Sequence, residues 1–265
     1  MITPSILVVA ERAGEPQMVL RKAAVLARHL GAQLELFACD LEHAGAVAQR
    51  HCSAAARGVV EACLADSARY LAALRGTVAA RDLTLRTCAA CAPSLYEALL
   101  CRSAALQPML VVKACTEPLW RYPGVVLRPD DLRLLREPPA PLLLTRGRTW
   151  QPLPIIGAWA ADAREAASLV PLAKEFAARC HGRFERLLPG AAPSSGRVLA
   201  ERVAEQRIDV LALPAAPGRT AEAADESPLP EELVGVLACD VLVVPRGSPP
   251  PEALADTVAL RVDPA

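Results

Sequence analysis

Residues 109–147 read MLVVKACTEPLWRYPGVVLRPDDLRLLREPPAPLLLTRG, and residues 209–247 repeat their plan as DVLALPAAPGRTAEAADESPLPEELVGVLACDVLVVPRG. Each copy holds a short apolar run, a loop, a proline with two acidic residues, and a second apolar run before Arg-Gly. The proline and the acids suit the first turn of a helix, and the apolar runs are typical of buried strands. A repeated strand, loop, helix and strand predicts two similar domains.

The rest of the chain alternates apolar runs with helical patterns. One long helical segment is expected over residues 46–80, and Ser94 is expected to cap a helix that runs to Leu106. Alternating strands and helices imply parallel pairing with right-handed crossovers. The first domain is therefore predicted to be a doubly wound, five-stranded α/β sheet in the order 3-2-1-4-5, with strands at Ser5–Ala10, Gln33–Cys39, Leu83–Thr87, Met109–Val112 and Leu142–Leu144.

The second copy is shorter before its repeat by about one long helix and one strand. Its expected elements are a strand at Ile155–Trp159, a helix over 162–180, a strand at Arg183–Leu188 and a helix over 195–206. The third strand lies at the edge of this sheet order, so its loss leaves four continuous strands. We assign residues 1–148 to the first domain, 149–247 to a shortened second domain and 248–265 to a tail whose weak strand, Thr257–Val262, has no decided partner.

Composition narrows the class of protein. The 265 residues are 53% apolar, which is enough to fill the hydrophobic cores of two domains. Because 29 basic residues balance 29 acidic ones, neither nucleic acid nor an anionic membrane is expected as a partner. Apolar runs are too short to span a membrane, and no signal segment is visible. We expect a cytoplasmic protein whose nine cysteines are reduced.

The residues of the repeat resemble a known family. The helix sequence Asp-Leu-Arg-Leu-Leu-Arg at 131–136, which leads through Pro139 into LLLTRG, is similar to the tandem universal stress proteins, and most of all to their E-type subgroup. The resemblance covers nearly the whole chain. It also rests on Val111-Val112-Lys113, Pro118-Leu119, Arg128–Asp131, Pro217–Thr220 and Cys239–Val244.

Some members of that family bind ATP through an Asp after the first strand and a Gly-x2-Gly-x9-Gly-Ser/Thr loop, whose bare amides approach phosphates. Both copies depart from this pattern. Ala10-Glu11 and Ala160-Ala161 follow the first strands, and the two loops keep one glycine each, Gly124 and Gly218. The motifs are therefore interpreted as degenerate, with no cofactor expected. Binding of ATP or AMP in the first-domain cleft stays as an alternative.

Candidate ligand contacts lie at the carboxyl ends of the strands, where open α/β sheets bind ligands. Glu11 and Lys113 follow the first and fourth strands, and Trp120 stands in the next loop. Alternatively, the two charges are solvated and Trp120 packs against the other domain. The corresponding candidates of the second domain are Trp159, Gly218, Arg219, which suits a phosphate or carboxylate unless it is simply solvated, and Thr220.

The pair Cys88-Ala-Ala-Cys91 is the sharpest chemical motif. We expect it between a strand and the helix that Ser94 caps, where a helix N-terminus lowers a thiol pKa. It is interpreted as a turn without chemical function, because an isolated motif of this kind is a weak signal, and a thiol redox or small-ligand-handling protein that uses both cysteines is the alternative. His51-Cys52 would add metal ligands to this pair, but these residues are better explained as surface positions near the start of a long helix, and no metal site is expected.

The sequence has no Gly-x-Ser-x-Gly, His-Glu-x-x-His or P-loop motif, so no enzyme is expected. The resemblance implies a universal stress protein that acts in the stress response through an unknown ligand or protein partner. It also implies that the last strands, Leu142–Leu144 and Val241–Val244, meet across a pseudo-twofold, as in the family's dimers. One chain would then mimic a dimer, and a further homo-oligomer stays open.

Overall fold

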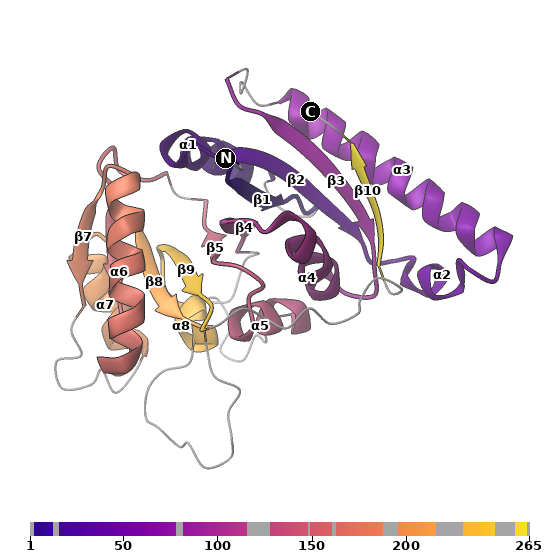
Figure 1. The fold of residues 1–265 in the computed structure, drawn as a ribbon. Coiled ribbons are helices and arrows are strands. Elements are labelled where there is room, and N and C mark those ends of the chain that lie inside the picture. Colours follow the sequence, from indigo (N-terminus) through magenta and orange to yellow (C-terminus); the bar gives the residue numbers. More distant parts are fainter. Residues whose placement is uncertain are drawn as a thin grey trace, which may run out of the picture. The chain divides into compact units, whose positions relative to one another are not determined.

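Parallel strands joined by helices run through the whole chain, and the protein has the predicted α/β fold. The computed structural model describes residues 3–12, 16–77, 82–115, 128–147, 149–160, 163–187, 196–215, 230–246 and 258–263. The chain forms two units, one of Met1–Ala114 with Pro249–Ala265 and one of Cys115–Ser248 (Figure 1). The predicted domain boundaries at 148 and 247 stay predictions.

The first unit is built on five strands in the order β10-β3-β2-β1-β4. The strands β1 to β4 are mutually parallel, as the order 3-2-1-4 predicts. The C-terminal strand β10 adds to the free edge of β3 in the antiparallel direction, from Ala259 opposite Cys91 to Asp263 opposite Thr87. The bounds are β1 Ser5–Val9, β2 Gln33–Asp40, β3 Leu85–Cys91, β4 Leu110–Ala114 and β10 Ala259–Asp263.

Helices of the first unit follow from local sequence signals. The helix α1 (Pro16–Leu30) begins at a proline and ends at Gly31, whose φ of 61° suits a residue without Cβ. Ser94 caps α4 (Leu95–Leu106) as predicted, because its Oγ accepts from the Glu97 amide at 3.1 Å. The two sheet faces differ in their cover, since α3 (Ala54–Gly76) packs on β2 and β3, while Arg102 of α4 reaches Glu35 on the other face.

The single helix expected over residues 46–80 is wrong in one respect. The segment forms two helices, α2 (Ala44–Gln49) and α3, separated by a turn. Ser53 starts the second helix, because its extended backbone lets Oγ accept from the Ala56 amide at 3.3 Å. The alanine-rich composition hid this cap, which separates α3 from α2.

The second unit carries strands in the order β5-β9-β8-β6-β7. The four strands of the second sequence copy, β7-β6-β8-β9, are parallel neighbours, which confirms the predicted loss of an edge strand. Their bounds are β6 Ile155–Ala158, β7 Arg183–Arg186, β8 Val210–Pro214 and β9 Asp240–Val244. The accompanying helices are α6 Ala163–Arg179, α7 Gly196–Glu205 and α8 Pro230–Val236.

The last strands of the two copies pair with each other. Strand β5 (Leu142–Thr145), which follows α5 (Pro129–Arg136), lies antiparallel to β9, with Leu143 opposite Leu242. The predicted meeting of these strands is confirmed, and it is the contact that would make one chain resemble a dimer.

A buried ion pair inside the first sheet was not predicted. The guanidinium of Arg102 on α4 donates to both carboxylate oxygens of Glu35 on β2, at 2.6 and 2.5 Å. This bidentate geometry offsets the cost of placing Glu35 in the core.

Within the described residues, no helix combines the length and the apolar character that a membrane crossing requires.

Candidate functional site

The predicted cleft of the first unit contains an ion pair. Lys113 lies beside Val9 in the register of β4 and β1, and its Nζ donates to Glu11 Oε2 at 2.8 Å. The lysine side chain is 1% exposed and the glutamate side chain 16%. The structure brings these two candidates into contact, and their contact with a ligand stays a prediction. They are not freely solvated loop charges, because each neutralises the other in a mostly dry place.

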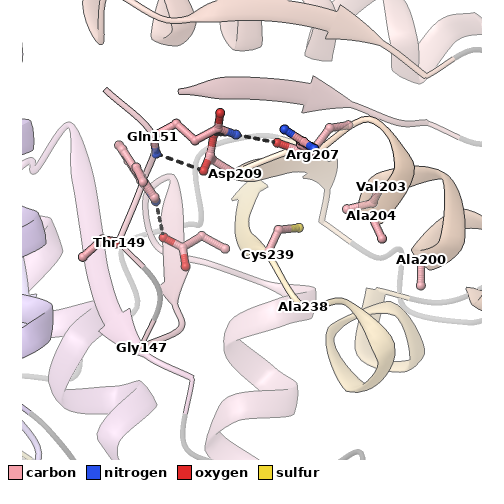
Figure 2. A pocket seen from close by; sticks show the side chains of 13 residues that line it. Gly147, Thr149, Gln151, Ala200, Val203, Ala204, Arg207, Asp209, Ala238 and Cys239 are labelled. Carbon is pink, nitrogen blue, oxygen red and sulfur yellow. Dashed lines mark hydrogen bonds between the residues drawn. The ribbon is translucent and has the colours of Figure 1, made fainter. Parts of the chain in front are cut away.

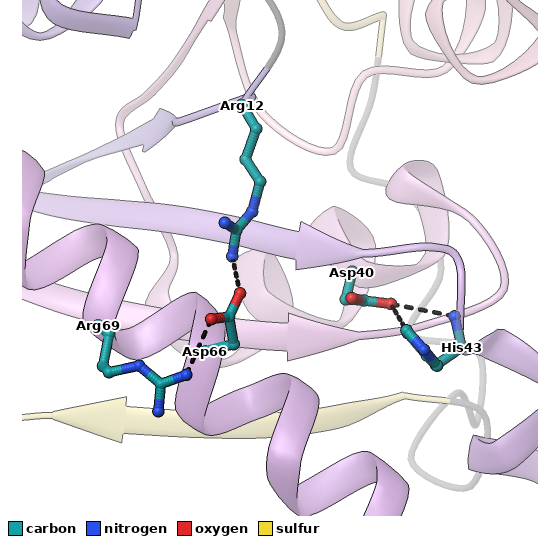
Figure 3. Close-up of polar contacts among 5 residues, drawn as sticks. All are labelled: Arg12, Asp40, His43, Asp66 and Arg69. Carbon is teal, nitrogen blue, oxygen red and sulfur yellow. Dashed lines mark hydrogen bonds and ion pairs between the residues drawn. The ribbon is translucent and has the colours of Figure 1, made fainter.

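A second group of polar side chains surrounds this pair. The Tyr70 hydroxyl on α3 donates to the Glu11 carbonyl at 3.2 Å, and Arg12 stacks over the Tyr70 ring at 4.9 Å. Arg12 also pairs with Asp66, which binds Arg69 at 2.9 Å (Figure 3). Arg69 holds the pKa of Asp66 below its ordinary value, with Arg12 adding to the effect. These exposed pairs orient the rim of the cleft but add little stability.

The remaining cleft candidates have different outcomes. Trp120, Gly218, Arg219 and Thr220 lie outside the described residues. Trp159 directly follows β6, its amide donates to the Ala212 carbonyl at 3.1 Å, and its side chain is buried. Among the described residues its indole Nε1 meets no hydrogen-bond partner.

The cysteine motif does not occupy the expected connection. Cys88 and Cys91 are both inside β3 and fully buried. Because side chains of a strand alternate, positions three apart face opposite sides of the sheet. Burial raises the pKa of Cys88 to about 12 and that of Cys91 to about 11. The expected helix-lowered pKa is wrong, since the strand extends four residues beyond its predicted end and removes both thiols from the helix start.

The described residues also form a hollow that the sequence did not predict, in the second unit. It measures about 590 Å³ and lies where β6, β8 and β9 begin (Figure 2). The cleft predicted for the second unit would lie at the other end of these same strands. Its walls come from the connection before β6, from α7 and from the start of β9. This volume is within the range of small-molecule sites. Trp150, Arg207 and Cys239 contribute its aromatic, cationic and thiol groups.

Two aspartates bind the connection that borders this hollow. Asp240, which is buried, accepts from the Arg146 amide and from Trp150 Nε1, each at 2.7 Å. Asp209 accepts from the Ile155 amide at 2.9 Å and the Gln151 amide at 3.2 Å. Both carboxylates are therefore used to hold the chain before β6. The sequence signal was present, because each aspartate stands immediately before or at the start of a buried strand.

Comparisons with known proteins place this architecture. No family model matches the sequence, and no curated protein matches it. A solved structure of a functionally unknown protein from Pseudomonas aeruginosa PAO1 aligns with TM-score 0.64 and 20% identity, over 96% of this chain and 95% of that one. A structure of a putative universal stress protein from Pseudomonas aeruginosa UCBPP-PA14 gives TM-score 0.62 and 19% identity, over 96% and 95%. A universal stress protein from Archaeoglobus fulgidus DSM 4304 gives 0.58 and 11%, over 93% and 100%.

The chain has the universal stress protein fold. Within this fold the two units differ at the ends of their central strands. The parallel registers put Trp159 where Val9 stands in the first unit, and Leu213 where Lys113 stands. The first unit therefore holds a buried charge pair at this place, and the second holds an indole beside an apolar side chain. The two units of this universal stress protein fold therefore differ in their chemistry at the carboxyl ends of the central strands.

Proposed function

We propose that this chain is a tandem universal stress protein of the E-type subgroup. The observation that carries the proposal is the fold similarity over 96% of the chain to a structure described as a putative universal stress protein, combined with the internal repeat. The role proposed is that of a non-catalytic stress-response factor that acts by binding a ligand or a protein.

We further propose that neither unit binds ATP through a glycine loop. The single glycines Gly124 and Gly218 offer too few bare amides for a phosphate cradle. In the first unit the acid after β1 is Glu11, and Lys113 already binds it at 2.8 Å. A nucleotide that used this carboxylate would have to separate a pair whose lysine is almost fully buried, and that separation is costly.

The hollow beside Trp150 is the place that best supports small-ligand binding. It combines apolar wall residues with an indole and with the cationic Arg207 at its border. These groups suit a small molecule that has an apolar body and an acidic group. The two aspartates contribute the rigidity of the border, because their oxygens already accept from the chain.

A ligand screen tests this function. Thermal unfolding would be measured with ATP, ADP, AMP, pyrophosphate and a panel of small carboxylic acids. A ligand at a hundred times its Kd adds about 2.7 kcal/mol of stability, so a binder is easily detected. We expect ATP to shift the unfolding temperature no more than pyrophosphate does. A shift specific to adenylates would contradict the proposal.

Two tryptophan variants locate a ligand that the screen finds. Trp150→Phe removes the indole that lines the hollow, and Trp159→Phe removes the buried indole that follows β6. Quenching of tryptophan fluorescence by the ligand that disappears only in Trp150→Phe would support binding in the hollow. Quenching that disappears only in Trp159→Phe would refute binding there. The stress role is tested separately by deleting the gene, since unchanged survival under heat, oxidation and starvation would contradict it.

A further inference from the structure

Three different metal-ligating groups meet at the end of β2 in the first unit. Asp40 is the last residue of β2, His43 precedes α2, and Cys63 lies on α3. Their donor atoms, a carboxylate oxygen, a ring nitrogen and a thiol sulfur, all lie within 4.8 Å of one another. Asp40 Oδ1 is 3.1 Å from His43 Nδ1 and also accepts from the His43 amide at 3.0 Å (Figure 3).

We propose that Asp40, His43 and Cys63 bind one Zn²⁺ ion. Zinc is the divalent ion whose usual ligands are thiolate, imidazole and carboxylate together. Its bonds to oxygen, nitrogen and sulfur are about 2.0–2.3 Å long, so the donors around one ion stand roughly 3.3–3.8 Å apart. The observed grouping needs only a small contraction to reach that geometry.

The local fold positions these donors before any ion arrives. Ala38 and Asp40 share the face of β2 that α3 covers, and the turn after β2 returns His43 to Asp40. Cys63 is buried, whereas the His43 side chain is 45% exposed. An ion can therefore enter from solvent on the histidine side and reach the thiol. Because the hydrogen bond from the His43 amide to the Asp40 carboxylate fixes the turn, little ordering is needed when the ion binds.

A second thiol, that of Cys91, lies outside the group of donors within 4.8 Å of one another and would have to move toward the ion. Cys91 on β3 is the register partner of Asp40 on β2, and it packs in a buried cluster with Val60, a residue of α3 one turn before Cys63. Zinc completes four-coordination either with a protein ligand or with water. We assign this fourth position to the Cys91 thiolate, which would give a closed site of two sulfurs, one nitrogen and one oxygen.

Carboxylates near the two thiols favour a cation, whereas burial of the thiols opposes their ionisation. Burial raises the pKa of Cys63, with the carboxylates of Asp40, Asp66 and Glu42 adding to the effect. Burial raises the pKa of Cys91 to about 11, with a smaller contribution from Asp40 and an opposing one from Arg50. Both thiols hold their protons near neutral pH, so Zn²⁺ must displace these protons into the solvent.

This inference is independent of the proposed stress function. It concerns a site between β2, α2 and α3, whereas the proposed hollow lies in the other unit. An ion here would join three elements whose connection depends on a turn and a capping serine. Binding should therefore stabilise the first unit.

Cobalt and zinc titrations test the site in the full chain. Reduced protein would be titrated with Co²⁺, and Zn²⁺ affinity would be measured by competition with a chromogenic chelator. We expect one Co²⁺ per chain, with a thiolate charge-transfer band and the intense visible bands of tetrahedral Co²⁺. Zn²⁺ should displace Co²⁺ with loss of both signals, because zinc bonds the same donors and has no visible transitions.

Matched variants decide which residues bind. His43→Ala should weaken Zn²⁺ binding by at least about tenfold, whereas His51→Ala, an exposed histidine of the turn between α2 and α3, should leave it unchanged. Cys63→Ser should reduce the charge-transfer band to that of one thiolate, whereas Cys180→Ser, which changes a buried cysteine of the other unit, should leave the band unchanged. His43 is exposed, so its variant stays informative even if Cys63→Ser fails to fold.

The contrary results are equally definite. A wild-type chain that takes up Co²⁺ without a thiolate band would refute the site. Equal Zn²⁺ affinities for His43→Ala and His51→Ala would also refute it. Retention of the thiolate band at full strength in Cys91→Ser would overturn the assignment of the fourth ligand.

Discussion

The buried ion pair at the end of β1 yields a sharp prediction about stability. Glu11→Ala would leave the ammonium of Lys113, 1% exposed, without its carboxylate. Removing one partner of a buried pair costs about 3–5 kcal/mol. We expect the lower end, about 3 kcal/mol, because Lys113 Nζ also donates to the Ala114 carbonyl at 3.3 Å.

The reverse substitution should cost much less. Lys113→Met fills the same space with an apolar chain and removes the ammonium from the Glu11 carboxylate, which belongs to a side chain that is 16% exposed and can be hydrated. We expect a loss of about 1 kcal/mol. The double variant should be more stable than Glu11→Ala by about 2 kcal/mol, since no charge is then left unpaired in the core.

Urea unfolding followed by circular dichroism measures these differences, and amide exchange in β1 and β4 provides a local readout. Arg12→Ala is the matched control, because it breaks an exposed pair with Asp66 in the same cluster, where the expected loss is below about 1 kcal/mol. The reasoning is refuted if Glu11→Ala costs no more than Arg12→Ala. It is also refuted if the double variant is no more stable than Glu11→Ala.

Four further predictions concern other parts of the chain. In the folded protein, Cys52 should react rapidly with a thiol reagent while Cys88 and Cys91 stay protected, and equal rates would contradict the strand assignment. The pKa of Cys88 is raised from 9.0 to about 12 in the folded protein. Its contribution to stability is therefore complete below pH 9 and is lost as the pH rises from 9 to 12. A free energy of unfolding that does not fall between about pH 8 and 11 would contradict this prediction. Asp240→Asn should cost about 1–3 kcal/mol and shift the Trp150 emission, because an amide cannot accept from both donors as a carboxylate does. A chain without β10 should self-associate in size-exclusion chromatography through the bared edge of β3, whereas a monomeric profile would contradict that role.

The sequence predicted the order of the parallel strands well, for a physical reason. Short runs of valine and leucine between breakers identify buried strands, and the crossover rule then leaves few arrangements. The repeat also identified the two strands that pair between the copies, β5 and β9. The edge partner of β10 could not be predicted, since any strand edge offers the same backbone groups.

Other errors came from residues with weak preferences. Strand β3 extends through Cys88-Ala-Ala-Cys91, where alanine and cysteine give no strand signal, and the neighbouring β2 and β10 determine its length. The break before Ser53 was hidden in an alanine-rich run. The aspartates at 209 and 240 looked like parts of a repeat, but their role depends on hydrogen bonds to a connection more than fifty residues earlier in the sequence.

Glu11 and Lys113 lie at the strand ends where the sequence predicts them, but their chemistry differs from the prediction. Sequence reasoning brought Glu11 and Lys113 to the same strand ends, and the structure places them in contact. It could not predict that the lysine would be buried, because burial depends on the tertiary packing around the end of the strand. That burial is what turns a candidate ligand contact into a neutralised pair.

The most direct test of the proposed function is equilibrium dialysis of the purified full-length chain against labelled Mg·ATP. We predict no saturable binding up to about 1 mM nucleotide, because neither loop has the glycines of a phosphate cradle and the acid after β1 is already paired. Saturable uptake of one ATP per chain with a Kd below about 100 μM would contradict this account.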